Sequence, residues 1–173
     1  FRAVADATDL PVCLYDIPGR CGIPIETDTL IALAEHPRIV AVKDAKADLF
    51  AATKVMAATD LAWYSGDDVL VLPHIAQGAV GLIGVTTHLA GQKYAALIDA
   101  ALAGRRQEAI ALNRELIAVA DAVMNTSQGA IMAKAGPVEL GAIEHATVRL
   151  PLVESTPEHL EKLRAGLAAS GLA

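Results

Sequence analysis

The chain has 173 residues, of which 54% are hydrophobic and only 3% aromatic, and its formal net charge is −6. This length and composition indicate one sizeable core of Ala, Leu, Val and Ile. The 14 lysine and arginine side chains are scattered, which argues against a nucleic-acid or membrane surface and favours a small-molecule partner. No apolar run is long enough to span a bilayer, and Cys13 and Cys21 lack metal-ligand spacing, so we expect a cytoplasmic protein.

Four apolar runs alternate with helical patterns in the first part of the chain. This alternation predicts a parallel sheet with right-handed crossovers. The chain starts with what resembles the last turns of a helix. Helices are then expected over residues 27–36, capped by Thr27 or Asp28, over 48–59, and over 69–77 before Gly78. The expected strands lie near residues 11–17, 38–44, 61–65 and 79–86.

After residue 90 the pattern becomes entirely helical. A last helix begins at STPE, where Ser155 or Thr156 is the cap and Pro157 occupies the first helical position. We therefore predict two domains, a βα part over 1–103 and a helical domain over 104–173, with Gly104 as the hinge. The other long helices are expected over residues 92–103, 105–125 and 128–142.

Each predicted strand ends in polar or reactive side chains, and the C-terminal ends of parallel strands are where active sites form in α/β folds. Lys43 directly follows the run IVAV. Side chains alternate along a strand, so we expect Ile39, Ala41 and Lys43 to share one face and Val40 and Val42 the other. A desolvated amine at this place could attack a carbonyl and form a Schiff base. The stretch alone favours a lysine whose ammonium reaches water.

Tyr15 ends its strand and is followed by DIPGR, a turn in which Pro18 and Gly19 fix a tight reversal and present Arg20. The phenol could pass protons to a substrate on the neighbouring lysine, and the guanidinium could bind a carboxylate. Each residue alone has an ordinary structural interpretation, as a packed strand-end tyrosine or a surface cation.

The segment SGDD at 65–68 is either a polar wall of a site or a helix start, and the helix start is favoured. No glycine-rich phosphate loop follows any strand, so a nucleotide site is not expected. No histidine shows pairing with a nucleophile or metal-ligand spacing, so we expect no metal site. The five are His36, His74, His88, His145 and His159.

The ordered series YDIPGR, VAVKDA, YSGDD and GLIGVT resembles the second half of the dihydrodipicolinate synthase family, which are class I aldolases and lyases. The family motif places a tyrosine, a proline, an arginine and a later strand-end lysine at Tyr15, Pro18, Arg20 and Lys43. The resemblance covers the whole chain, including KAGPVELG and RLPLVESTPEHLEKL. Asp16 and Cys21 depart mildly from it, since many members have Asn and Thr there.

The resemblance implies the second half of a (β/α)8 TIM barrel followed by a C-terminal helical domain, in a homo-oligomer, usually a tetramer. Lys43 would form the Schiff base with pyruvate, without a separate cofactor, and Tyr15 would relay protons. Arg20 would bind the carboxylate of L-aspartate 4-semialdehyde, and the backbone at Ile83 would lie against the pyruvyl group. The product would be 4-hydroxy-tetrahydrodipicolinate, on the route to lysine and diaminopimelate.

Two alternatives remain open at this point. One is a sister pyruvate-dependent lyase acting on N-acetylneuraminate or a keto-deoxy sugar acid. The other is a truncated, non-catalytic family member, because family members are much longer and the N-terminal half barrel is missing here. We expect the 173 residues to be a fragment, a partly described chain or one piece of a split chain.

Overall fold

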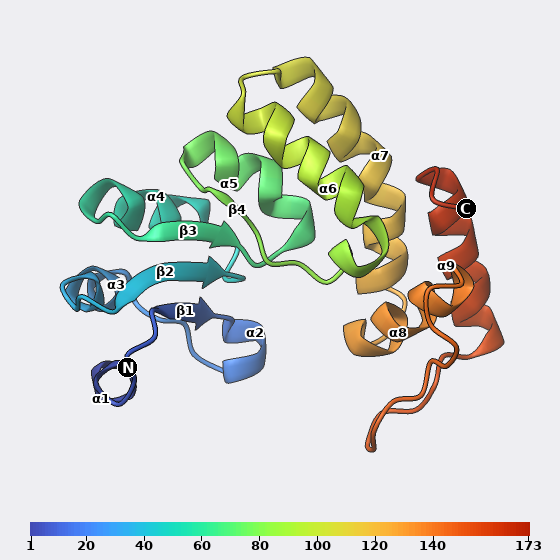
Figure 1. The fold of residues 1–173 in the computed structure, drawn as a ribbon, viewed down its shortest axis with the longest axis horizontal. Coiled ribbons are helices and arrows are strands. Elements are labelled where there is room, and N and C mark those ends of the chain that lie inside the picture. Colours follow the sequence, from blue (N-terminus) through green and yellow to red (C-terminus); the bar gives the residue numbers. More distant parts are fainter. The chain divides into compact units, whose positions relative to one another are not determined.

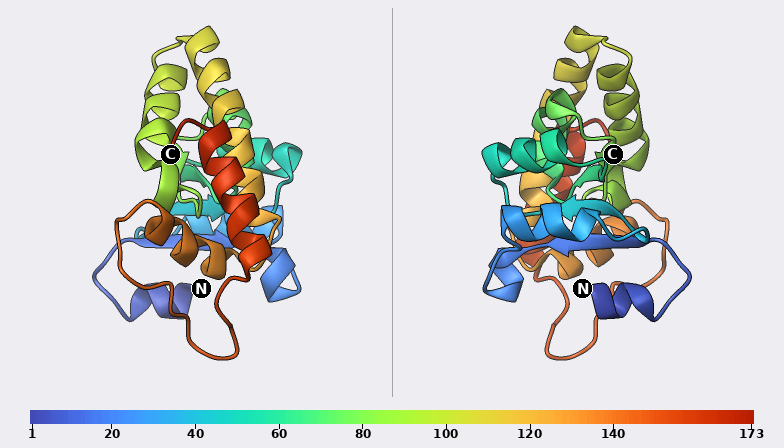
Figure 2. Two further views of the ribbon diagram at one scale, coloured as in Figure 1. Left: turned by 90° about the vertical axis from the view of Figure 1, so that its right-hand side faces the viewer. Right: turned by 90° about the vertical axis from the view of Figure 1, so that its left-hand side faces the viewer.

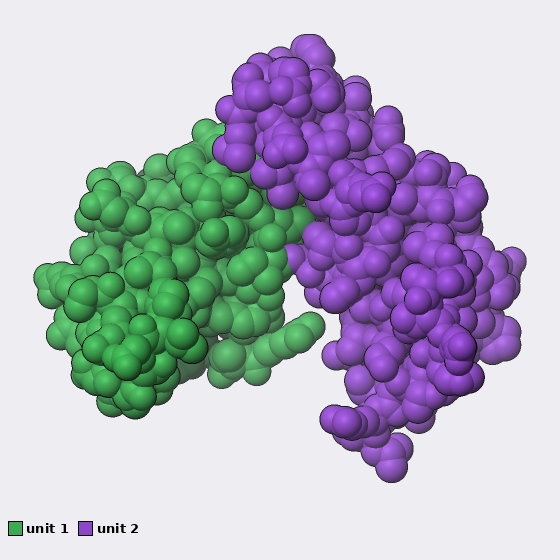
Figure 3. Space-filling model, in the orientation of Figure 1, with its two compact units in different colours: residues 1–83 green, residues 84–173 purple.

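The computed structural model describes the whole chain and divides it into two compact units, Phe1–Ile83 and Gly84–Ala173 (Figure 3). This division precedes the expected boundary at residue 104. The helix α6 (Thr87–Leu102), expected to belong with the sheet, packs on α7 (Arg106–Met124) within the second unit. The two units are described separately below.

The first unit alternates strands and helices, as the sequence predicted, and the arrows of β1, β2 and β3 point the same way in Figure 1. The last strand is much shorter than the expected 79–86. Beyond it, Val85 and Thr86 already accept hydrogen bonds from the first turn of α6. The elements are α1 (Arg2–Asp6), β1 (Val12–Asp16), α2 (Pro18–Cys21), α3 (Thr27–Ala34), β2 (Ile39–Asp44), α4 (Leu49–Ala58), β3 (Ala62–Ser65), the 3₁₀-helix η1 (Asp68–Leu70), α5 (Val71–Gln77) and β4 (Gly81–Leu82).

The four strands form one parallel sheet in the order β1-β2-β3-β4. One face of the sheet carries the core of the unit, where side chains of the strands pack with those of α3 and α4. Burial of each large aliphatic side chain contributes about 1.5–3 kcal/mol, so this face accounts for much of the unit's stability. The strand and helix members include Leu14, Ile39, Val42, Trp63, Leu30, Leu33 and Val55.

The register between β1 and β2 shifts by one residue near the start of both strands. Val12 pairs with Ile39, but Cys13 pairs with Ala41, so Val40 is an extra residue on β2. Ile39 is buried in the core beside Val42, whereas Val40 is 43% exposed. The expected alternation was therefore wrong for Ile39, because a β-bulge resets the alternation of faces between Ile39 and Ala41.

Local hydrogen bonds explain where the helices of this unit begin and end. The Asp48 side chain accepts a hydrogen bond from the Ala51 N–H at 2.9 Å and caps α4, which begins where the sequence predicted. Gly78 ends α5 in the left-handed conformation, with φ of 116°. At α3 the expected caps were wrong: the helix begins at Thr27 after Glu26, which makes no capping side-chain bond.

The second unit consists of helices, and Figure 2 shows α6, α7 and α9 (Pro157–Ala169) running side by side. Its remaining helix is α8 (Gly129–Glu139). Thr156 caps α9 by accepting a hydrogen bond from the His159 N–H at 3.3 Å, as the STPE motif predicted. The first long helix begins at Thr87, earlier than the expected residue 92.

No single helix of the chain is both long and apolar enough to cross a membrane, although α7 and α8, bent by 117° at their break, together have a suitable length and composition.

Candidate active site

The sheet face opposite the core carries a row of register partners at the carboxyl ends of the strands. Tyr15 on β1 pairs with Lys43 on β2, and Lys43 pairs with Tyr64 on β3. Tyr64 in turn pairs with Gly81 on β4. A Cβ atom at Gly81 would lie 3.3 Å from the Tyr64 ring, so the glycine leaves room for that ring. The lysine is thus flanked by two tyrosines on one face.

Lys43 and Tyr15 are in direct contact. The Nζ atom of Lys43 lies 4.0 Å from the centre of the Tyr15 ring, which is a cation–π distance. Lys43 is half-buried and Tyr15 is 42% exposed. The predicted neighbourhood of these two residues at the strand ends is therefore present in the structure, and both side chains can be reached from the open face.

Arg20 lies on α2, directly after β1, and its side chain is exposed without an ion pair inside the chain. The expected tight turn at Pro18 and Gly19 is instead a single helical turn, Pro18–Cys21. The residue in the left-handed conformation is Gly22, with φ of 81°, and not Gly19. Arg20 thus follows the carboxyl end of β1, where the DIPGR motif was expected to present it.

Ile83 directly follows β4 and is 42% exposed. Its N–H donates a hydrogen bond to the Ser65 carbonyl at 2.9 Å, which holds this backbone segment against the end of β3. Ile83, Lys43 and Tyr15 therefore all lie at the carboxyl end of the same sheet.

Cys13 precedes Tyr15 by two residues on β1, so both side chains lie on the sheet face opposite the core, which we call the open face. It is exposed, although the sequence suggested a small hydrophobe inside a strand. Partial burial raises the pKa of its thiol, and Lys43 opposes this through its positive charge and a hydrogen bond from its backbone.

A second row of register partners, directly after the first, faces the helices. Asp16, Asp44 and Ser65 pair across β1, β2 and β3, and all three are buried. The Ile25 N–H donates a hydrogen bond to Asp16 Oδ1 at 3.0 Å. Burial raises the pKa of the Asp16 carboxyl; Asp44 and Glu26 add to this, while the Ile25 hydrogen bond and Lys46 oppose it. Strand alternation could have shown that these carboxylates point away from Lys43.

His74 on α5 connects two members of this second row, which the sequence did not indicate. Its Nδ1 lies 2.9 Å from Ser65 Oγ, and its Nε2 lies 3.4 Å from Asp44 Oδ2. The SGDD segment is a helix start, as favoured, because the Asp67 side chain accepts a hydrogen bond from the Val69 N–H and precedes η1. No group of three or more histidine, cysteine or acidic side chains could hold a metal ion.

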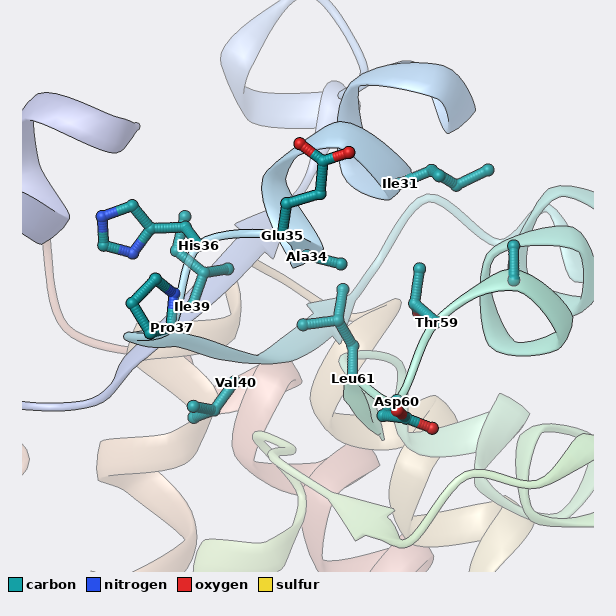
Figure 4. A pocket seen from close by; sticks show the side chains of 11 residues that line it. Ile31, Ala34, Glu35, His36, Pro37, Ile39, Val40, Thr59, Asp60 and Leu61 are labelled. Carbon is teal, nitrogen blue, oxygen red and sulfur yellow. The ribbon is translucent and has the colours of Figure 1, made fainter.

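A cavity of about 480 Å³ lies at the opposite end of the sheet, near the beginnings of β2 and β3 (Figure 4). Its lining includes Glu35, His36 and Val40 on one side and Thr59, Asp60 and Leu61 on the other. Lys43, at the carboxyl end of β2, does not line it. In α/β barrels that amino-terminal end contributes to stability, whereas chemistry takes place at the carboxyl end.

Comparisons with known proteins agree with this arrangement. The model of the "Dihydrodipicolinate synthetase family" matches residues 1–170. The 4-hydroxy-tetrahydrodipicolinate synthase of Kineococcus radiotolerans is 49% identical over 173 residues, which are 100% of this chain and 56% of the relative. The chain thus spans about half the length of this curated relative.

Solved structures of the same kind superpose closely. A dihydrodipicolinate synthase from Cyanidioschyzon merolae with lysine bound has a TM-score of 0.94 and 37% identity, covering 100% of this chain and 59% of that one. The chloride-inhibited enzyme of Acinetobacter baumannii, complexed with pyruvate, has a TM-score of 0.93 and 33% identity, covering 99% and 59%.

The fold is the α/β class in which parallel strands and helices form part of a TIM barrel, with a helical region after it, and the strand-end lysine lies where such barrels carry their chemistry. The chain belongs to the dihydrodipicolinate synthetase family and corresponds to the C-terminal part of its members.

Proposed function

We propose that the protein carrying this chain condenses pyruvate with L-aspartate 4-semialdehyde to give 4-hydroxy-tetrahydrodipicolinate, a step toward lysine and diaminopimelate. It is then a lyase of the Schiff-base type, and no cofactor other than the lysine adduct is required. The observation that carries the proposal is the amine of Lys43 placed 4.0 Å from the Tyr15 ring at the carboxyl end of the sheet.

Lys43 has the role of nucleophile. Its neutral amine adds to the ketone carbon of pyruvate, and loss of water from the adduct gives the imine. Removal of a proton from the pyruvyl methyl group gives an enamine, which attacks the aldehyde carbon of the second substrate. Attack of the semialdehyde's amino group on the imine carbon then closes the ring and releases the lysine.

Tyr15 has the role of proton relay, because its phenol belongs to the ring that the Lys43 amine contacts and the side chain is 42% exposed. A hydroxyl there can give a proton to the departing water and take one back in the condensation. Arg20 binds the carboxylate of the semialdehyde, since a planar guanidinium without an internal partner can donate two parallel hydrogen bonds. The backbone at Ile83 lies against the pyruvyl group.

The location and assembly form part of the same proposal. We infer a cytoplasmic enzyme that forms a homo-oligomer, a tetramer by resemblance to the family. The acidic balance, with 20 aspartate and glutamate residues against 14 lysine and arginine residues, favours small-molecule chemistry and argues against a nucleic-acid surface.

Borohydride reduction in the presence of pyruvate tests the proposal. The protein that carries these 173 residues should gain one reduced pyruvyl group, and peptide mapping should place it on Lys43. Lys46, three residues away and half-buried, is the matched control: Lys46→Ala should retain the label, while Lys43→Ala should lose it. A protein that takes up no label at Lys43 would be the non-catalytic family member.

The second substrate is tested separately. Turnover of L-aspartate 4-semialdehyde with pyruvate should exceed the cleavage of N-acetylneuraminate or a keto-deoxy sugar acid. Label on Lys43 combined with faster cleavage of a sugar acid would identify a sister lyase instead, and would leave the role of the lysine intact.

A further inference from the structure

His74 is a buried histidine that the proposed chemistry does not use. It lies on α5, its side chain is 0% exposed, and it is the only buried histidine of the chain. A polar ring in such a place needs partners, because an unpaired buried polar group is costly. Its two ring nitrogens face different strands: Nδ1 faces Ser65 on β3, and Nε2 faces Asp44 on β2.

The hydrogen bonds of Ser65 determine which atom is the donor in its contact with His74. Ser65 Oγ donates to the Asp67 carbonyl at 2.7 Å, and a hydroxyl has only one proton to give. His74 Nδ1 must then donate to Ser65 Oγ, at 2.9 Å. Ser65 is therefore an acceptor from His74 and is 0% exposed, so this set of residues is not a nucleophile with its base.

The other ring nitrogen faces a carboxylate. Nε2 of His74 lies 3.4 Å from Asp44 Oδ2, within ion-pair distance but outside hydrogen-bonding geometry. Both side chains are buried, with exposed fractions of 0% and 4%, so the ring nitrogen and the carboxylate face each other away from solvent. The histidine thus bridges β2 and β3 through two buried polar contacts at the same level of the sheet.

The bridge lies one residue from the lysine. Asp44 directly follows Lys43, and its Oδ1 accepts a hydrogen bond from the Lys46 N–H at 2.8 Å. The Asp44 carbonyl accepts one from the Gly66 N–H at 2.6 Å. A Cβ at Gly66 would lie 2.9 Å from that carbonyl carbon and oxygen, so the approach requires glycine. The Oδ2 atom is the carboxylate oxygen left for His74.

We propose that His74 is a positioning residue: its bridge between Asp44 and Ser65 fixes the carboxyl end of β2 and thereby holds the Lys43 amine over Tyr15 for imine formation. The inference rests on the proposed function of Lys43 as the nucleophile. Reaction rates depend strongly on such placement, since small displacements of a reacting group are costly in rate. His74 acts on Lys43 through Asp44, because Asp44 is the next residue along the chain.

The test is the rate at which borohydride traps pyruvate on Lys43, measured by mass in the protein that carries this chain. His74→Phe removes both polar contacts and keeps an aromatic ring, and it should slow trapping at least tenfold. His74→Gln retains an amide donor and should recover part of the rate. Leu33→Ala, a buried core substitution on α3, is the control for lost stability and should trap at the unsubstituted rate.

A double-substitution cycle separates positioning from general weakening. Ser65→Ala removes the oxygen that accepts the hydrogen bond from His74 Nδ1 and keeps the backbone of β3, so it should also slow trapping. The double variant should be no slower than His74→Phe alone, because both changes break the same link. If His74→Phe does not fold, Ser65→Ala carries the test by itself.

Three results would overturn the inference. The first is that His74→Phe traps pyruvate at the unsubstituted rate. The second is that its trapping rate falls by no more than that of Leu33→Ala. The third is that the rate effects of the two substitutions in the cycle multiply, as those of independent sites do. These outcomes differ from failure of the proposed function, in which the unsubstituted protein itself takes up no label on Lys43.

Discussion

Lys43 and Tyr15 are register partners on adjacent parallel strands, and the lysine amine lies 4.0 Å from the centre of the tyrosine ring. Direct partners on neighbouring strands project from the same face, so the backbone ladder itself brings the two side chains together. The contact holds the amine by the ring, and the phenol oxygen remains available for proton transfer. The ring and the hydroxyl can therefore be tested separately.

Replacement of Tyr15 by Phe should keep the cation–π contact and remove the proton relay. We expect kcat to fall by roughly 10²- to 10⁴-fold, the usual contribution of a general acid–base group. Borohydride trapping at equilibrium should still place pyruvate on Lys43. Tyr64→Phe is the matched control, since Tyr64 is the register partner on the other side of the lysine and should retain turnover. Undiminished turnover in Tyr15→Phe would remove the relay role.

Replacement of Arg20 by Ala should weaken binding of the semialdehyde. A lost hydrogen-bonded contact with a charged group costs about 1.5–3 kcal/mol, so KM for this substrate should rise about 10- to 150-fold. KM for pyruvate should not change. Lys54→Ala, which removes an exposed cation from α4, is the control for the loss of one positive charge. An unchanged KM in Arg20→Ala would show that the carboxylate binds elsewhere.

Replacement of Asp16 by Asn should change the pH dependence of stability. Burial raises the pKa of Asp16 in the folded protein, so its contribution is most favourable when the carboxyl is protonated and is lost as pH rises through the folded pKa. Asn keeps the acceptor for the Ile25 N–H. We expect Asp16→Asn to stabilise the protein near neutral pH by about 1 kcal/mol or less, the scale of ordinary single substitutions.

Urea unfolding at several pH values measures this effect. The advantage of Asp16→Asn over the unsubstituted protein should grow from about pH 4, near the ordinary pKa of an aspartate, toward pH 7. An advantage that shrinks over this interval would mean that the ionised carboxylate is the stabilised form.

Replacement of Gly166 by Ala should separate α9 from α7. A Cβ there would lie 2.6 Å from the Ala122 Cβ and 2.9 Å from the Ala118 carbonyl oxygen, so the helices must move apart. We expect a loss of about 1–3 kcal/mol in the free energy of unfolding, typical of overpacked cores. Gly91→Ala, with nothing within 4 Å, should instead be neutral or stabilise α6. Thermal melting of both variants compares them directly, and equal melting temperatures would contradict the predicted clash.

The residues that sequence patterns located correctly are those whose signal is local. The βα period and the STPE cap are written in neighbouring residues, and so the strands, the helices and the strand-end position of Lys43 could be predicted. The bulge at Val40 has no such signal, since valine suits an ordinary strand equally well. His74 was missed for a different reason: its partners come from two other elements, and only the packing of α5 brings them to the ring.

The bulge at Val40 decides which side of the sheet receives the lysine. Side chains on a strand alternate with a period of two, so one additional residue inverts the parity of everything that follows. Counted from the buried Ile39 without a bulge, Lys43 would point into the helix-covered core and Asp44 would face the open side. The bulge thus lets Ile39 and Val42 both enter the core while Lys43 stays on the open face, and deletion of Val40 would restore regular alternation with the amine still on that face.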